Sequence, residues 1–156
     1  MKIQIKNYHG AEQKDLILNE IKKCITNRLY VNGWSLRNIY LSILSPLTND
    51  DLFDKIQLIT VYENGNENPI AVLLYSISGC SFPTFFLPKN AINVFVKRKY
   101  RKNGIGKQMI DIICQQNEIE TNKVDVYTIY SGVEGSFDFY QKCISKYADF
   151  NEIDGL

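Results

Sequence analysis

The residues best suited to chemistry gather in one short stretch, residues 96–107, which read VKRKYRKNGIGK. The pattern predicts a strand that runs into a basic loop and a helix that starts where the loop ends. The first N–H groups of a helix have no partner within it and lie at the positive end of its dipole, so they attract anions. Gly104 and Gly106 lack a Cβ and would let a phosphate approach the backbone, while Lys102 and Lys107 add positive charge. The stretch is a candidate site for two linked phosphates, although a helix start with solvated lysines would contain the same residue types.

Two widespread phosphate-binding motifs do not fit this stretch. The Walker A motif needs Gly-Lys followed by Ser or Thr after four spacer residues, and that run is absent. The dinucleotide fingerprint GxGxxG needs a third glycine at the position of Met109. A phosphate site here must follow another pattern.

Residues 101–106, RKNGIG, resemble the Arg/Gln-x-x-Gly-x-Gly/Ala signature of the GNAT superfamily of N-acetyltransferases. The wider family pattern also has a valine that ends the preceding strand, an aromatic residue in the loop and apolar residues early in the helix. The residues that fill these positions are Val96, Tyr100, Ile105, Met109 and Ile110. The resemblance in sequence covers about residues 92–114. It implies that acetyl-CoA, or a close acyl-CoA, is bound and that its acyl group passes to an amine.

The same resemblance implies where the cofactor binds. In the family the fourth and fifth strands splay apart, pantetheine lies between them, and main-chain groups of the fourth strand hold it. Here that strand ends at Phe95 and Val96, and the pyrophosphate would bind at the loop and helix start. The expected cofactor-binding residues are Phe95, Val96, Arg101, Lys102, Asn103, Gly104, Ile105, Gly106 and Lys107.

The resemblance also implies that Tyr140 is the catalytic acid. Relatives often carry an aromatic-Tyr-Glu-Lys stretch in the fourth helix, which residues 139–142 (FYQK) echo, but Val133 replaces their asparagine and no Gly-Phe follows. A tyrosine of ordinary pKa near 10 stays protonated at neutral pH and can protonate a departing thiolate of pKa near 8.5. A purely structural role is the alternative, because the following residues share one helical face: Phe137, Tyr140, Ile144 and Tyr147.

The sequence does not single out a general base. Many relatives carry a glutamate on the fourth strand, but residues 91–96 (AINVFV) contain no acid. Four other residues could act through water, and solvent alone could also accept the proton. The four candidates are Tyr75, Tyr127, Tyr130 and Glu134.

The elements around the loop are expected in the order β-α-α-β-β-β-α-β-α, which is also the order of the GNAT fold. Alternation and helical periodicity predict strands over residues 2–8, 56–62, 70–77, 91–96 and 124–130. They predict helices over residues 11–29, 36–43, 104–117 and 134–146, leave residues 79–90 and Asp50 and Asp51 in loops, and allow a short strand at the end. An antiparallel meander joined to a strand–helix–strand crossover indicates an α/β (α+β) fold, with a mixed, mostly antiparallel central sheet flanked by helices.

Composition restricts the remaining function classes. The chain has 156 residues, 45% of them hydrophobic, and a net charge of +1. These values fit one domain over residues 1–156, which the resemblance implies is acetyltransferase-like, and they give no global sign of a nucleic-acid partner. No run approaches the about 18 apolar residues of a membrane span, and no signal peptide is apparent, so the expected location is cytoplasmic.

Hydrolase and metal chemistry have little support in the sequence. His9 is the only histidine, so any Ser-His-Asp or Cys-His catalytic site would have to use this one residue. The four cysteines form no CxxC pair or metal-ligand spacing, so we expect no metal and read them as free buried thiols. They are Cys24, Cys80, Cys114 and Cys143.

The acceptor and the partners stay open. An amine-bearing small molecule or a protein could be the acceptor, chosen by residues around 28–45 and 79–90, with Trp34 and Arg37 as possible lining residues. A homodimer is compatible with the sequence. Two alternatives remain: an inactive CoA- or protein-binding module of the same fold, and a nucleic-acid site built from the six basic residues between 97 and 107.

Overall fold

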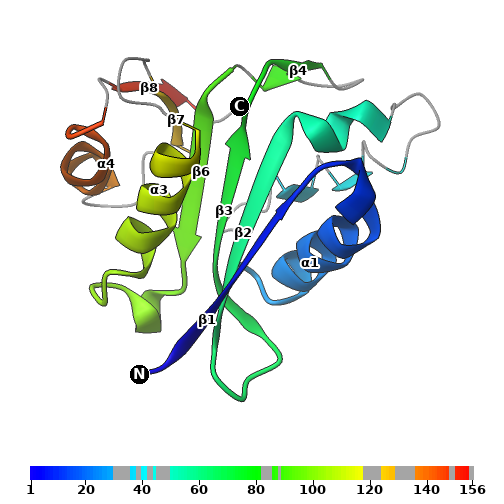
Figure 1. Ribbon diagram of the computed structural model, residues 1–156. Coiled ribbons are helices and arrows are strands. Elements are labelled where there is room, and N and C mark those ends of the chain that lie inside the picture. Colours follow the sequence, from blue (N-terminus) through cyan, green and yellow to red (C-terminus); the bar gives the residue numbers. More distant parts are fainter. Residues whose placement is uncertain are drawn as a thin grey trace.

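The computed structural model describes residues 1–29, 36–37, 40–41, 44, 50–81, 86–87, 89–117, 124–128, 136–147 and 150–154. In this part of the chain a six-stranded sheet runs in the order β1-β2-β3-β6-β7-β8 (Figure 1). Its strands are β1 (Ile3–His9), β2 (Ile56–Glu63), β3 (Pro69–Ser76), β6 (Ala91–Val96), β7 (Val124–Thr128) and β8 (Phe150–Asp154).

The sheet changes from antiparallel to parallel at β6. Strands β1, β2, β3 and β6 are antiparallel neighbours, whereas the β6–β7 and β7–β8 pairs are parallel. Parallel neighbours need a crossover connection, and the helices α3 (Ile105–Gln116) and α4 (Ser136–Ile144) lie within these two connections. The predicted mixed, mostly antiparallel sheet is therefore confirmed.

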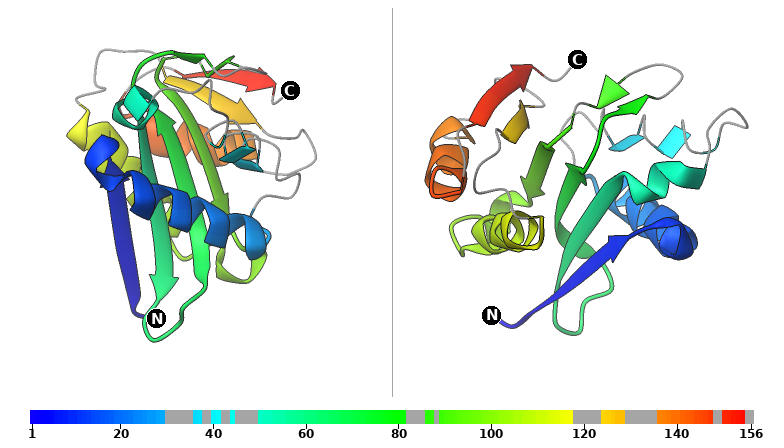
Figure 2. Two further views of the ribbon diagram at one scale, coloured as in Figure 1. Left: turned by 90° about the vertical axis from the view of Figure 1, so that its right-hand side faces the viewer. Right: turned by 45° about the horizontal axis from the view of Figure 1, so that its top comes forward.

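Helices cover both faces of the sheet. Helix α1 (Lys14–Thr26) packs on one face, and α3 and α4 pack on the other (Figures 1 and 2). Each face has its own apolar cluster, one centred on Ile17 and Ile21 of α1 and the other on Met109 and Ile113 of α3. Strands β2 and β3 lie between the two clusters, and nearly all of their residues are buried.

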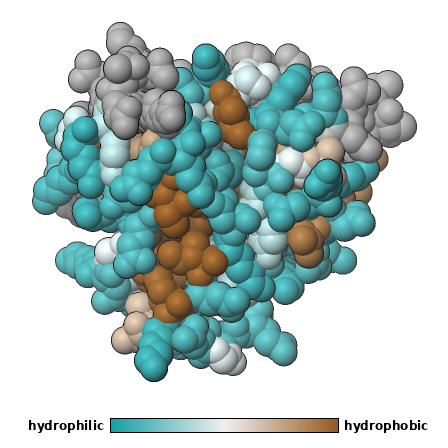
Figure 3. Space-filling model, in the orientation of Figure 1, coloured by the Kyte–Doolittle hydropathy of each residue, from teal (hydrophilic) through white to brown (hydrophobic). Residues whose placement is uncertain are grey.

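The apolar core reaches the surface on the α3 side. Figure 3 shows a strip of apolar side chains on this face, bordered by hydrophilic residues. Ile3 and Ile5 of β1 and Ile112 of α3 are partly buried and pack against the core cluster of this side. Helix α3 thus covers β1 less completely than it covers the centre of the sheet.

The other expected elements are present, one expected helix is described only in part, and the differences are two short strands and three 3₁₀ turns. Residues 79–90 are not all loop, because β4 (Cys80–Ser81) and β5 (Phe86–Leu87) pair as a small antiparallel ladder. Asp50 and Asp51 belong to a 3₁₀ helix, η2 (Asp50–Asp54), and two further 3₁₀ turns are η1 (Ala11–Gln13) and η3 (Arg98–Tyr100). Elements of two to five residues are too short to give a detectable period. Of the second expected helix, residues 36–37 and 40–41 are helical, and the remainder lies outside the described residues.

The buried face of α1 carries one charged residue that the apolar pattern did not predict. Glu20 is only 3% exposed. Its Oε2 accepts hydrogen bonds from the hydroxyls of Tyr62 and, at 3.1 Å, Thr60, and its Oε1 lies 3.7 Å from Lys6 Nζ. Burial, reinforced by the hydrogen bond to Glu20 and by its charge, raises the pKa of the Tyr62 hydroxyl. Glu20 therefore ties α1 to β1 and β2 through polar contacts.

Candidate functional site

Strands β6 and β7 pair over only a short length. Among the described residues their parallel ladder consists of Ala91 with Asp125 and Ile92 with Val126. Strand β6 continues to Val96 and stays paired with β3 on its other side. Among the described residues, β7 thus pairs with β6 only at Ala91 and Ile92, and the edge of β6 at Val94 and Val96 is not paired with β7.

The main-chain groups of Val94 and Val96 point toward this edge. The Val94 N–H donates to the hydroxyl oxygen of Tyr140 at 3.2 Å, and the Val96 carbonyl accepts from Arg101 Nε at 2.8 Å. Alternate residues of an antiparallel strand direct their N–H and C=O groups to opposite sides. The main chain of Phe95 consequently faces β3, and that of Val94 and Val96 faces the edge that is not paired with β7.

Tyr140 lies between the core and the backbone of β6. Its ring belongs to the apolar cluster on the α3 side, is 5% exposed and meets the Phe139 ring edge-on at a centroid distance of 5.2 Å. Its hydroxyl reaches the backbone of β6. The sequence offered packing in the core and action as the catalytic acid as alternatives for Tyr140. Its position is compatible with both, because the ring is buried and the hydroxyl reaches a strand edge.

The loop before α3 has the backbone conformation of an anion site. Gly104 is the N-cap of α3 with φ 75° and ψ 7°, and Lys102 also has a positive φ of 68°. No side chain caps α3 and no acid lies in its first turn, so its first N–H groups and its dipole remain uncompensated. Successive N–H groups in such turns form concave anion-binding nests. A non-glycine residue in the left-handed region costs free energy and often marks a functional site.

The two glycines of the loop have different surroundings. Gly104 is exposed, and a Cβ added there would meet no atom within 4 Å. Gly106 is buried, and a Cβ added there would lie 2.6 Å from Cζ of Phe139. Gly104 therefore leaves open space at the helix start, whereas Gly106 allows close contact between α3 and α4.

The remaining residues of the loop differ in exposure. Arg101, Lys102 and Asn103 are exposed, and Arg101 also stands 5.5 Å from the centre of the Phe95 ring. Ile105 is 2% exposed and belongs to the core, so only its main chain can contact a ligand. The structure thus brings the predicted cofactor residues together at the end of β6 and the start of α3.

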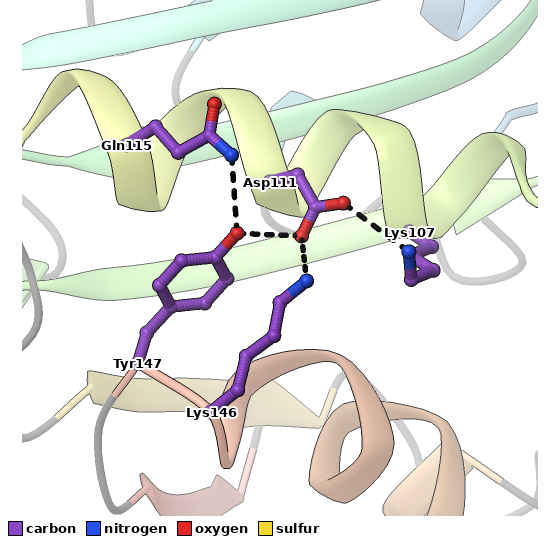
Figure 4. A network of polar contacts seen from close by, with 5 residues as sticks. All are labelled: Lys107, Asp111, Gln115, Lys146 and Tyr147. Carbon is purple, nitrogen blue, oxygen red and sulfur yellow. Dashed lines mark hydrogen bonds and ion pairs between the residues drawn. The ribbon is translucent and has the colours of Figure 1, made fainter.

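A polar network joins the start of α3 to the turn after α4 (Figure 4). Asp111 lies 3.1 Å from Lys146 Nζ and 3.5 Å from Lys107 Nζ, and it accepts a 2.9 Å hydrogen bond from the Tyr147 hydroxyl. Partial burial opposes ionisation, but the hydrogen bonds and positive charges outweigh it and lower the pKa of Asp111. Sequence reasoning missed this network, although the four-residue spacing of Lys107 and Asp111 is a recognisable helical pair.

Of the four residues considered as a general base, only Tyr75 has a described side chain. Tyr75 is 1% exposed and donates to Asn90 Oδ1 at 2.7 Å, and burial raises its pKa to about 12, which disfavours the ionised form that a base would need. Tyr127 lies on β7, but its side chain is outside the described part. Tyr130, Glu134, Trp34 and Val133 also lie outside it, and Arg37 is exposed.

Histidine and cysteine take no part in the site as described. His9 Nδ1 lies 2.9 Å from the Ile56 carbonyl oxygen, where the edge strand β1 pairs with β2, and β3 separates this pair from β6. Cys24, Cys114 and Cys143 are buried free thiols, as expected, and the side chain of Cys80 is not described. The described residues contain no group of three or more His, Cys, Asp or Glu side chains that could hold a metal ion. No helix in the described part of the chain is long and apolar enough to cross a membrane.

The fold has counterparts among solved structures. No family model and no curated protein matches the chain. An aminoglycoside acetyltransferase from an uncultured soil metagenomic sample has a TM-score of 0.56 at 12% identity, over 91% of this chain and 90% of that chain. A ribosomal-protein-alanine N-acetyltransferase from Brucella melitensis biovar Abortus 2308 has a TM-score of 0.50 at 12% identity, over 90% of each chain. The chain therefore has the fold of the GNAT N-acetyltransferases, as the resemblance in residues 101–106 implied.

Proposed function

We propose that the protein is an acyl-CoA-dependent N-acyltransferase, with acetyl-CoA as the donor and an amine as the acceptor. One observation carries the proposal: Tyr140 places its hydroxyl on the Val94 N–H, at a β6 edge that β7 leaves uncovered. An uncapped helix start lies at the end of the same strand. Main-chain groups at a strand edge, a tyrosine hydroxyl beside them and an uncapped helix start at the end of the strand together suit a thioester with a pyrophosphate at its far end.

In this proposal the pyrophosphate binds the N–H groups at the start of α3, with Lys102 and Lys107 nearby. Pantetheine then follows β6 along the edge that the main chain of Val94 and Val96 faces. Val96 was expected to make such contacts, and in this proposal Val94 joins it in place of Phe95, because the Phe95 groups face β3. The buried Ile105 and Gly106 support the loop, and Arg101 and Asn103 shape it.

The proposed reaction is direct transfer. The amine nitrogen attacks the thioester carbonyl carbon, and the oxyanion that forms needs a hydrogen-bond donor, for which we propose the main-chain N–H of Val96, since the Val94 N–H already donates to Tyr140. The tetrahedral intermediate then collapses, the C–S bond breaks and the thiolate of CoA leaves. Tyr140 donates its proton to that thiolate, and the proton lost by the amine passes to solvent and returns to the phenolate.

An inactive CoA-binding module is the second candidate. Strand β6 has no acid, and Tyr75, the one base candidate whose side chain is described, is held in its neutral form. Such a protein would bind CoA through the same loop without releasing free thiol. The cytoplasm, where thiols such as Cys24 remain reduced, is the compartment that we propose for either activity.

Two measurements decide between these functions. Isothermal titration with CoA tests binding, and free-thiol release from acetyl-CoA tests turnover with a panel of amines, peptides and aminoglycosides. Binding together with amine-dependent thiol release supports the enzyme. Binding alone supports the module, and the absence of CoA binding by folded protein contradicts both. Binding to DNA or RNA with a steep salt dependence would favour a nucleic-acid role instead.

A further inference from the structure

Helix α4 docks against α3 at a position where α3 has no side chain. A Cβ on Gly106 would come within 2.6 Å of Cζ and 2.9 Å of Cε1 of Phe139. Contacts below 3.0 Å force atoms to move, and Phe139 is itself partly buried against the core. The missing side chain at position 106 therefore lets the Phe139 ring lie directly against α3.

Phe139 immediately precedes Tyr140, and the two rings are in edge-to-face contact at 5.2 Å. Displacement of Phe139 would thus be passed to Tyr140. The hydroxyl of Tyr140 is 3.2 Å from the Val94 nitrogen, close to the upper limit of an effective hydrogen bond. A small outward movement of α4 is enough to break this contact.

The other end of α4 is fixed to α3 as well. Lys146 and Tyr147, in the turn after α4, both contact Asp111 of α3 (Figure 4). Tyr140 therefore lies between two anchors, the Gly106–Phe139 contact before it and the Asp111 contacts after it. Loss of the first anchor would tilt α4 about the second instead of releasing the whole helix.

We propose that Gly106 is a positioning residue for Tyr140: its missing Cβ lets Phe139 seat against α3, and this seating holds the Tyr140 hydroxyl at the main chain of β6. This role differs from making room for a phosphate, which is the role that we propose for Gly104. The inference rests on the proposed function only where Tyr140 acts as the acid. The placement of the Tyr140 hydroxyl stands apart from any activity.

The test is a compensating pair of substitutions. Gly106→Ala adds the clashing Cβ, and Phe139→Leu removes the Cε and Cζ atoms that it would meet. We expect Gly106→Ala to lower kcat by about tenfold or more, since a shift near 1 Å in a reacting group can cost up to about a hundredfold. The double variant should recover to within about threefold of Phe139→Leu alone. Gln141→Ala, an exposed change on α4, is the control for an unspecific effect.

Two further measurements separate positioning from other roles. In a Tyr140→Phe background, Gly106→Ala should have no additional effect on kcat, whereas a merely structural role would lower kcat equally in both backgrounds. The Kd of CoA should stay within about threefold, which corresponds to under about 0.7 kcal/mol. A tenfold weaker Kd that Phe139→Leu does not correct would overturn the proposal, because Gly106 would then serve the phosphates.

Amide hydrogen exchange at Val94 gives a readout that needs no activity. We expect faster exchange in Gly106→Ala, as in Tyr140→Phe, and restored protection in the double variant. Unchanged protection in Gly106→Ala overturns the proposal. If the wild type binds CoA but turns over no amine, the proposed function fails, while the exchange result still decides the positioning role. If Gly106→Ala does not fold, a folded double variant with a protected Val94 amide supports the proposal, and an unfolded double variant contradicts it.

Discussion

Tyr140 combines a buried ring with a hydroxyl on the β6 backbone, so its two roles can be separated by removing one atom. Tyr140→Phe keeps the packing of the ring. We expect kcat to fall about 10–100-fold with little change in the Kd of CoA, because only the acid is lost. The lost hydrogen bond should lower the free energy of unfolding by about 0.5–1.5 kcal/mol. Turnover at the full rate, with only the loss of stability, would show that the hydroxyl is structural.

Gly104 presents open space and a left-handed backbone at the start of α3. Gly104→Asp places a carboxylate where the phosphates are proposed to bind, so CoA affinity should fall more than about tenfold, or more than about 1.4 kcal/mol. Gly104→Asn is the matched control, because asparagine has the same size and tolerates the left-handed region without the charge. Isothermal titration of both folded variants makes the comparison. Equal affinity of the Asp and Asn variants would argue against an anion site here.

Glu20 is a buried carboxylate on α1, on the sheet face opposite α3, and it tests stability alone. Glu20→Ala leaves the Tyr62 and Thr60 hydroxyls without their acceptor, so we expect the free energy of unfolding to fall by about 2 kcal/mol or more. Glu20→Gln keeps an acceptor and should cost less. Urea denaturation measures both, and a loss below about 0.5 kcal/mol for the alanine variant would contradict the structural role. The kcat of folded Glu20→Gln should match that of the wild type.

At the scale of elements, the polar contacts between α3 and the turn after α4 depend on the ionised form of Asp111. The pKa of this carboxyl is lowered in the folded protein, so its stabilising contribution is complete above the unfolded pKa near 4 and is lost as the pH falls through the lower folded value. We expect Asp111→Asn to be less stable than the wild type at pH 7, and the difference to shrink below about pH 4. Denaturation at pH 7 and pH 3 measures it, and a difference that grows at pH 3 would contradict this account.

Most elements, but few of their functional details, could be predicted from the sequence. The alternation in residues 91–96 and the periodic apolar residues of 104–117 placed β6 and α3, and the RKNGIG run placed the glycine-containing loop between them. The hairpin of β4 and β5 was missed because two-residue strands have no period. The positive φ of Lys102 was missed because lysine does not favour that region. The reason for Gly106 could not be read either, because Phe139 becomes its neighbour only when α4 packs on α3.

At the scale of the whole molecule, the sheet should not be equally stable throughout. Strands β2 and β3 have a paired strand on each side and helices on both faces, whereas β8 is an edge strand and β7 meets β6 over two described residue pairs. Local openings occur where buried contacts and ladder hydrogen bonds are few. We expect the amides of β7 and β8 to exchange before those of β2 and β3. Equal protection across all six strands would contradict this order.

The proposed cofactor site consists largely of main-chain groups: the uncovered edge of β6, the left-handed turn at residues 102 and 104 and the first N–H groups of α3. Such groups are present whatever side chains the strand carries, provided that the backbone keeps its path. Evolutionary drift can therefore replace most surface and many core residues without removing a single one of these contacts. Backbone geometry, more than residue identity, is the trait by which distant relatives of this chain should be sought.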